Sequence, residues 1–136
     1  MVSDPSALRK QSETYTLKDI VLGYIQLMKP GIMVLLVLEA ITAMLVASGR
    51  SVSLNGLLWL TLVGILSSGG AASLNQFLER DNDILMSRTD FRPVATGRIS
   101  PTNSMIFGVA LAGLGLAISF FVFNLMTMSM ALLGML

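Results

Sequence analysis

Residues 99–136 read ISPTNSMIFGVALAGLGLAISFFVFNLMTMSMALLGML and contain no Asp, Glu, Lys or Arg. Two earlier stretches are nearly as apolar: residues 32–49 hold Glu39 as their one charge, and residues 51–79 hold only Glu79, at the end. Apolar runs of this length are typical of helices that cross a bilayer, whose hydrocarbon core is about 30 Å thick. The sequence therefore predicts an integral membrane protein.

The composition of the whole chain excludes an ordinary soluble domain. Of its 136 residues, 54% are hydrophobic and 12% are charged, and the mean hydropathy is +0.76, whereas a soluble domain carries about 25% charged residues. The net charge of +1 excludes a strongly basic nucleic-acid-binding protein. Because the chain has no Cys and no His, it offers neither a thiolate metal site nor an imidazole base.

The apolar segments predict an all-α, polytopic membrane helical bundle with about three complete spans and the start of a fourth. The last segment has room to cross only about half of the hydrocarbon core at 1.5 Å per residue, so we expect the sequence to continue in a longer chain. Ser100 and Pro101 suit the N-cap and the first position of the third span, and Asn124 predicts a short turn. The expected spans are about 32–48, 54–74, 102–123 and, incomplete, 126–136.

The residues before the first span predict a polar tail and then an amphipathic helix. Residues 1–16 are polar and of mixed charge, which is typical of a disordered tail. Residues 17–28 carry apolar side chains at helical spacing and are flanked by lysines, which favours a helix lying on the membrane surface. The alternative is that they form the solvent-exposed first turns of the next helix. Pro30 and Gly31 are expected to break the pattern.

The distribution of Lys and Arg predicts the orientation of the chain. Four of these residues precede the first span, Arg50 alone lies between the first and second spans, and four lie between the second and third. Cytoplasmic loops carry the excess of basic residues. We therefore expect a multi-pass protein of the inner (plasma) membrane, with its N-terminus and residues 75–100 in the cytoplasm.

Three polar residues at the end of the second span, Asn75, Glu79 and Asp83, are spaced i, i+4, i+8. Each step of four residues turns an α-helix by about 400°, so the three side chains share one face. Two carboxylates and an amide oxygen form a hard ligand set that suits Mg²⁺, with water and substrate phosphates completing its shell. We take these three as candidate metal-binding and catalytic residues, and Asp81, off this face, as an outer acid.

Small residues continue the same face from Asn75 back into the membrane. They are Ala71 or Ala72, then Ser68 and then Gly64. They either allow close helix packing or leave room for an elongated apolar ligand, and both can hold at once. Glu39 in the first span is a further candidate for lining a cavity, because an ionised carboxylate at that depth is costly and usually functional. The alternative for Glu39 is a protonated or hydrogen-bonded structural residue.

A basic loop carrying Arg88, Arg92 and Arg98 follows the acidic residues, and Pro93 and Gly97 are expected to stop the helix. Arginine beside a metal suits a metal-bridged diphosphate, because the guanidinium fork can bind oxygens that the metal leaves free. Taken alone, each arginine is also explained by its effect on membrane topology. Membrane topology explains the whole set much less well.

The pattern N-x-x-x-E-x-x-x-D at 75–83, followed by R-T-x-x-R-P at 88–93 and G-R-I-S-P at 97–101, resembles the first conserved region of the UbiA superfamily of membrane prenyltransferases. Within this superfamily, the sequence LNQFLERDND…SRTDFRPVATGRISP is most similar to the protoheme IX farnesyltransferase (haem O synthase) family. The segment LMKPGIMVLLVLEAI is similar to the opening helix of that family. The resemblance covers residues from about 25 to 136.

The resemblance implies a nine-span enzyme that binds farnesyl diphosphate through Mg²⁺ and transfers the farnesyl group to haem B, giving haem O for terminal oxidases. It implies that Asn75, Glu79 and Asp83 bind the metal. Diphosphate contacts would come from Arg88 and Arg92, and from Lys29 on the first helix. The second acidic motif of the family has no counterpart in these residues, so we expect this chain alone to be inactive.

Two other functions stay open at this point. Another UbiA-type enzyme would prenylate a quinone precursor or a different aromatic acceptor in place of haem B. A non-catalytic membrane fragment or helical subunit would use the acidic residues only to bind cations.

Overall fold

The computed structural model describes residues 15–49 and 51–136, and these residues form helices joined by short loops. The all-α prediction is confirmed, and three helical segments, Pro30–Ser48, Leu54–Leu85 and Pro101–Phe123, are long and apolar enough to cross a membrane. The predicted polar tail lies almost entirely outside the described residues, as does Arg50. The helices are α2 (Leu17–Leu27), α3 (Pro30–Ser48), α4 (Leu54–Leu85), α5 (Pro101–Ile118), the π-helical η1 (Ser119–Phe123) and α6 (Leu125–Met135).

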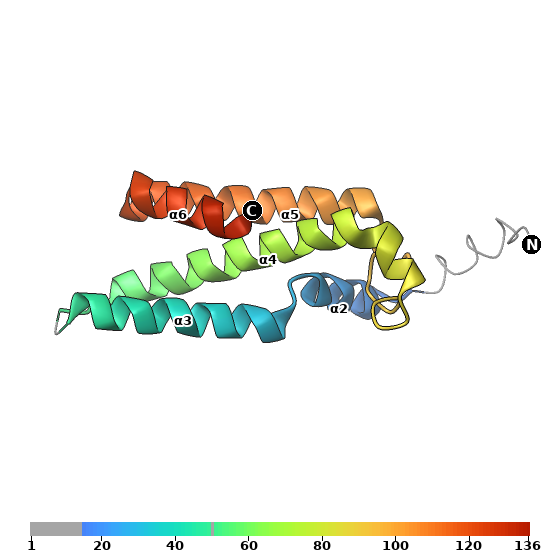
Figure 1. Cartoon of the computed structure of the whole chain (residues 1–136), viewed down its shortest axis with the longest axis horizontal. Helices are drawn as coiled ribbons and strands as arrows, with labels where there is room; N and C mark the ends of the chain where they lie inside the picture. Colours follow the sequence, from blue (N-terminus) through green and yellow to red (C-terminus); the bar gives the residue numbers. More distant parts are fainter. Residues whose placement is uncertain (1–14, 50) are drawn as a thin grey trace, which may run out of the picture.

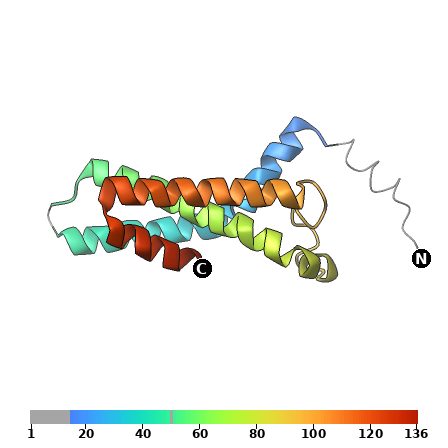
Figure 2. The ribbon, with the colours of Figure 1, turned by 90° about the horizontal axis from the view of Figure 1, so that it is seen from above.

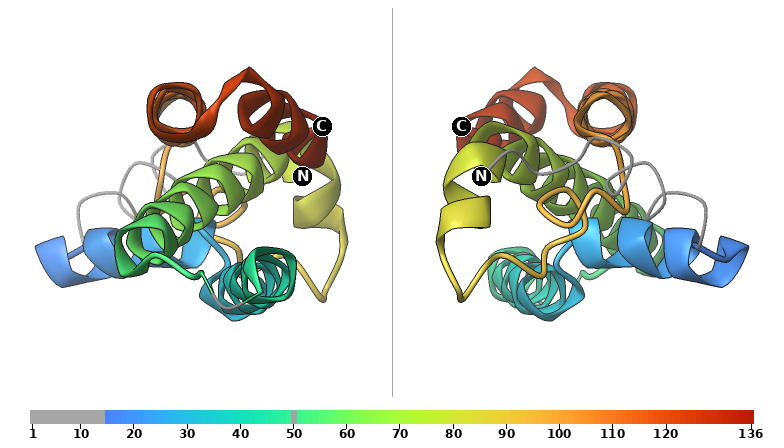
Figure 3. Two further views of the ribbon diagram at one scale, coloured as in Figure 1. Left: turned by 90° about the vertical axis from the view of Figure 1, so that its left-hand side faces the viewer. Right: turned by 90° about the vertical axis from the view of Figure 1, so that its right-hand side faces the viewer.

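The long helix α4 lies between α3 and α5, and both neighbours run antiparallel to it (Figures 1 and 3). After η1 the chain reverses, and α6 returns along the bundle toward the middle of α4 (Figure 1). The loop between α4 and α5 and the short helix α2 both lie at one end of the bundle, the end where α4 is polar (Figure 2). This end brings the sequence-predicted acidic and basic residues together.

Helix α2 is a separate element, so the alternative that its residues begin the next helix is wrong. Thr16 and Asp19 form a capping box at its start. At its end the chain turns at Lys29, whose φ of 49° lies in the left-handed region. Pro30 then occupies the first turn of α3, a position where its missing N–H costs nothing. Pro30 therefore opens the first span two residues earlier than expected.

Helix α4 runs unbroken through both the apolar and the polar part of its sequence. Its 32 residues make a rod of about 48 Å at 1.5 Å per residue, longer than a hydrocarbon core of about 30 Å. It ends at Leu85, so the expectation that Pro93 and Gly97 stop it is wrong. Met86 is already extended, and the Asp83 carbonyl near the helix end accepts hydrogen bonds from the Met86 N–H at 3.4 Å and from the Thr89 hydroxyl at 3.2 Å.

Small residues bring α4 and α5 into backbone contact. A Cβ built on Gly70 would lie 2.6 Å from the Ala112 backbone nitrogen, and one on Gly108 would lie 2.8 Å from Leu74 Cγ. The buried Ser104 hydroxyl donates to the Ser73 carbonyl across this contact at 3.1 Å. Close packing and interhelical hydrogen bonds of this kind hold membrane helices together.

The predicted boundaries of the third span agree closely with the helices. Ser100 accepts a hydrogen bond from the Asn103 N–H at 3.2 Å, and Pro101 follows in the first turn of α5. Asn124 ends η1 and caps α6 by accepting from the Thr127 N–H at 2.8 Å. The turn expected at Asn124 is therefore confirmed.

The surface of the bundle is largely apolar. Large hydrophobic side chains such as Leu35, Val46 and Phe121 are 67%, 78% and 81% exposed, and extended apolar surface marks contact with lipid or with other protein. The compact hydrophobic cluster of Leu27, Val94 and Ile99 lies instead at the polar end, where it joins the end of α2 to the loop before α5. That cluster fixes the loop that carries the arginines.

Candidate functional site

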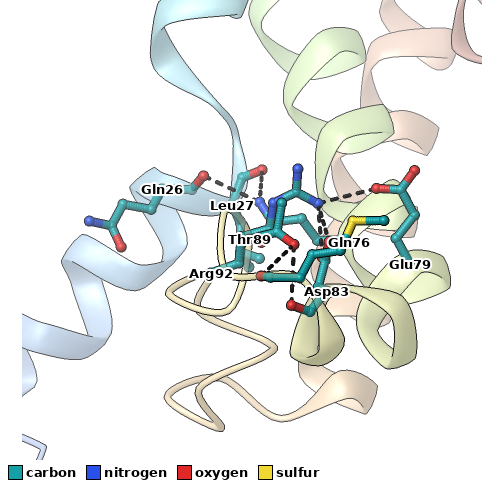
Figure 4. A network of polar contacts seen from close by, with 8 residues as sticks. Gln26, Leu27, Gln76, Glu79, Asp83, Thr89 and Arg92 are labelled. Carbon is teal, nitrogen blue, oxygen red and sulfur yellow. Dashed lines mark hydrogen bonds and ion pairs between the residues drawn. The ribbon is translucent and has the colours of Figure 1, made fainter.

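Glu79 and Asp83, from the last turns of α4, converge on one guanidinium group, that of Arg92 in the following loop (Figure 4). Arg92 Nη1 lies 2.8 Å from each carboxylate oxygen of Asp83 and 3.2 Å from Glu79 Oε2. The spacing of four residues puts both carboxylates on one side of α4. The third predicted residue of this face, Asn75, lies one turn before Glu79 on the same helix.

Burial differs along the acidic face. The Asp83 side chain is 5% exposed, that of Glu79 is 46% exposed and that of Arg92 is 20% exposed. Burial by itself lowers the pKa of Arg92, but the hydrogen bonds and charges of Asp83 and Glu79 outweigh it and raise the pKa above its ordinary value. The guanidinium therefore stays charged and serves as the counter-ion of both acids.

The backbone of the arginine loop is held independently of this ion pair. The Thr96 hydroxyl donates to the Arg92 carbonyl at 3.1 Å, and the buried side chains of Val94 and Ile99 anchor the loop on Leu27. Arg98 donates to the side-chain oxygen of Gln26 at 3.0 Å. The loop is thus attached to α2 as well as to α4.

Gln76 is a site residue that the sequence analysis missed. Its side chain is 1% exposed, and Nε2 donates to the carbonyls of Gln26 and Leu27 at 3.4 and 3.2 Å (Figure 4). Its Oε1 is buried without a hydrogen-bond partner among the described residues. Gln76 thereby fixes the end of α2 against α4, two residues before Lys29. A polar residue directly beside Asn75 was the available signal, but its buried partner on α2 was not predictable.

An open cleft of about 670 Å³ lies between α3, α4 and α6. Lys29 and Asn75 line it together with a wall of small residues from α4 that includes Gly64, Ser68 and Ala72. The cleft thus follows the predicted face of α4 from Asn75 into the apolar part of the helix. The small residues of α4 have different neighbours: Gly70 and Ser73 pack against α5, whereas Gly64 and Ser68 line the cleft, and a Cβ on Gly64 would also lie 3.1 Å from Val37 Cγ2 on α3.

Three other predicted residues lie apart from this arrangement. Glu39 is exposed on α3 and is not among the residues that line the cleft. Arg88 is exposed in the loop, and the described residues offer its side chain no hydrogen bond or ion pair. Asp81 is 82% exposed and lies 3.6 Å from its neighbour Arg80 rather than beside Glu79.

The donor set fits a hard cation at the position where Glu79 and Asp83 converge. In the described part of the chain no group of three or more His, Cys, Asp or Glu side chains gathers at one point, so these two carboxylates would be the charged ligands. A positive group, Arg92 Nη1, already sits between three of their oxygens. Carboxylate oxygens together with an amide oxygen suit Mg²⁺, which usually keeps waters and substrate phosphates as further ligands.

Residues 36–136 match the profile of the UbiA prenyltransferase family. The chain belongs to this family. Curated relatives include the protoheme IX farnesyltransferase of Caldivirga maquilingensis, 42% identical over 97 residues, which are 71% of this chain and 34% of the relative. The Halobacterium salinarum protoheme IX farnesyltransferase is 44% identical over 121 residues, 85% of this chain and 26% of the relative. Protoheme IX farnesyltransferase 1 of Pseudomonas putida is 37% identical over 113 residues, 83% of this chain and 38% of the relative.

The chain spans between 21% and 38% of the length of the curated relatives it matches. No solved structure matches it.

Proposed function

We propose that this chain forms the first metal- and diphosphate-binding half-site of a haem O synthase, an enzyme that transfers a farnesyl group from farnesyl diphosphate to haem B. The observation that carries the proposal is the convergence of Glu79 and Asp83 on one cationic position. Asn75, one helical turn before Glu79, lines the cleft. Relatives named protoheme IX farnesyltransferase support haem B as the acceptor.

Each residue has a role that follows from its place. Glu79 and Asp83 would hold Mg²⁺, with Asn75 contributing its amide oxygen. When bound, the ion would neutralise the charge that develops on the leaving diphosphate. Lys29, at the cleft beside Asn75, and Arg92 and Arg88 in the loop would bind the remaining diphosphate oxygens, as guanidinium and ammonium groups do.

The cleft suits the hydrocarbon part of a prenyl donor. Its walls are mainly apolar side chains of α3, α4 and α6, and the small residues of α4 keep it open. A ligand with a diphosphate at Lys29 and Asn75 would therefore lay its farnesyl chain along Ser68 and Gly64. In the reaction the C–O bond breaks, the diphosphate leaves with the electron pair, and a vinyl carbon of haem B takes the farnesyl carbon. Addition of water, with loss of a proton, completes the hydroxyethylfarnesyl group.

The basic residues also support a proposal for the location: the inner (plasma) membrane, with the polar end of the bundle in the cytoplasm. Farnesyl diphosphate, a charged soluble donor, would then reach the acidic residues directly, while haem B would approach from the bilayer.

The test is the conversion of haem B by the protein expressed from its complete reading frame and reconstituted in lipid nanodiscs. With farnesyl diphosphate and Mg²⁺ we expect haem O, identified by chromatography and mass spectrometry, and no product when EDTA replaces Mg²⁺. Prenylation of 4-hydroxybenzoate but not of haem B would show a UbiA-type enzyme with another acceptor. Failure with both acceptors, by a protein that still binds Mn²⁺, would favour the non-catalytic reading and contradict the proposal.

A further inference from the structure

We infer that Arg92 and the divalent metal ion compete for the same carboxylate oxygens, so that metal binding releases the Arg92 guanidinium to the diphosphate. The inference rests on the proposed function, because it takes Glu79 and Asp83 as the metal ligands. It adds a regulation of that site: the metal and the diphosphate each make the binding of the other more favourable.

The competition follows from the contacts of a single nitrogen atom. Arg92 Nη1 makes hydrogen bonds to both oxygens of Asp83 and to one oxygen of Glu79. A cation held by both acids would bind at least one oxygen of Asp83, and both of those oxygens already accept from Nη1. Two positive charges cannot lie that close together without strong repulsion, least of all beside a carboxylate that is only 5% exposed. Either the guanidinium or the metal ion can occupy the position, but not both.

The guanidinium can leave without unfolding the loop. Its ion pair involves Nη1 alone, and no hydrogen bond of Nε or Nη2 to the described residues is present (Figure 4). The loop backbone is fixed separately, by Thr96 and by the buried side chains of Val94 and Ile99. Rotation of the side chain about its own bonds is therefore sufficient, and it leaves a fork of N–H donors close to the metal.

The consequence is positive coupling between the two ligands. Without a metal ion, Arg92 is engaged by Asp83 and Glu79 and is a poor ligand for a phosphate oxygen. Once the metal ion takes the carboxylates, Arg92 has lost its counter-ions and becomes available to the diphosphate. Because linkage is reciprocal, a diphosphate that captures Arg92 also strengthens metal binding by the same factor.

Arginine modification tests this on the unaltered protein in nanodiscs, with metal as the only ligand. Phenylglyoxal reacts with accessible guanidinium groups, and mass spectrometry reports the extent at each arginine. Addition of Mg²⁺, against NaCl of equal ionic strength, should raise the modification rate at Arg92 about fivefold or more, the lower end of typical coupling between sites. Arg88, exposed and outside the ion pair, is the internal control and should change little. An unchanged or reduced rate at Arg92 would overturn the inference.

Mn²⁺ binding, followed by electron paramagnetic resonance of the free ion without any diphosphate, gives the second measurement. Arg92→Gln should tighten Mn²⁺ binding about fivefold or more, because the competitor is gone, whereas Arg88→Gln removes the same charge from the same loop without removing a competitor. An Asp83→Asn variant identifies the share of bound Mn²⁺ that belongs to this site. Equal Mn²⁺ affinities of the Arg92 and Arg88 variants would show that only the loss of a positive charge matters, and would contradict the competition.

Both measurements are independent of the acceptor. If Mg²⁺ releases Arg92 but haem B is not prenylated, the proposed function fails and the competition stands. If haem O forms while Arg92 stays unaffected by metal, only the competition fails.

Discussion

Asp83 combines the deepest burial with the strongest pairing among the acidic residues of α4. Both of its carboxylate oxygens lie 2.8 Å from Arg92 Nη1, and its backbone carbonyl accepts from Thr89. Asp81, two residues earlier, is 82% exposed, and among the described residues its ion pair is with the neighbouring Arg80. Two acids of the same short segment therefore have different surroundings, and the difference comes from the 100° by which successive residues turn around a helix.

The substitution Asp83→Asn should lower farnesyl transfer to haem B by about 100-fold or more in the protein expressed from its complete reading frame. Metal stabilisation of a leaving group is worth several kcal/mol, and each ~1.4 kcal/mol corresponds to a factor of ten in rate. The assay is haem O formation at saturating Mg²⁺. Asp81→Asn removes an equal charge from the exposed face and should cost much less. If Asp81→Asn is the more damaging change, the ligand assignment at i, i+4, i+8 is wrong.

At the scale of elements, the small residues of α4 lie on two sides of the helix and have different neighbours on each side. Gly70 and Ser73 let α5 approach to backbone contact, whereas Gly64 and Ser68 open the cleft toward α3 and α6. Close helix packing, one of the two alternatives for these residues, is observed, and the role of the cleft residues in holding an apolar ligand stays a prediction. The acidic residues and the cleft wall belong to the same helix. The packing of α4 against α5 therefore also determines the direction in which the acidic side chains point.

Gly70→Ala should destabilise the bundle by about 1–3 kcal/mol, the usual cost of overpacking. The added methyl would lie 2.6 Å from the Ala112 backbone nitrogen and 2.9 Å from the Gly108 carbonyl oxygen, and neither can move without shifting α5. Unfolding by sodium dodecyl sulfate in mixed micelles, followed by circular dichroism, measures the change.

The matched control is Gly113→Ala on α5, where an added Cβ meets nothing within 4 Å. This variant should be neutral or slightly more stable, because Ala is favoured over Gly inside a helix by about 1 kcal/mol. Equal stabilities of the Gly70 and Gly113 variants would show that α4 and α5 do not pack at this distance.

At the scale of the whole molecule, the two ends of the bundle differ in charge. The end with α2 and the loop 86–100 carries the acidic and basic residues, whereas the opposite end carries the short connection between α3 and α4. We propose, from the excess of Lys and Arg before the first span and between the second and third, that the first end faces the cytoplasm. The structure brings these charged residues to one end of the bundle.

Single cysteines test this orientation without further engineering, because the chain has no native Cys. In intact spheroplasts a membrane-impermeant maleimide should label Ser51→Cys, in the α3–α4 connection. It should label Asp90→Cys, exposed in the arginine loop, only after the membrane is permeabilised. The reverse pattern would contradict the orientation and with it the cytoplasmic site.

The sequence by itself determined the fold class and the position of most helices. Nearly uncharged segments long enough for a bilayer favour helices, because a helix satisfies its backbone hydrogen bonds internally in lipid. Ser100 and Pro101 marked the start of a helix correctly, and Asn124 marked a turn. The common face of Asn75, Glu79 and Asp83 also followed from the sequence, since it needs only 3.6 residues per turn.

The tertiary structure alone decided which groups meet. Arg92 lies nine residues beyond Asp83 in an irregular loop, so its return onto both acids depends on Leu27, Val94 and Ile99 packing together. Gln76 acquires its role from carbonyls some fifty residues away on α2. Local propensities fix the helices because their hydrogen bonds are local, whereas contacts between distant segments depend on side-chain packing, which no short pattern in the sequence encodes.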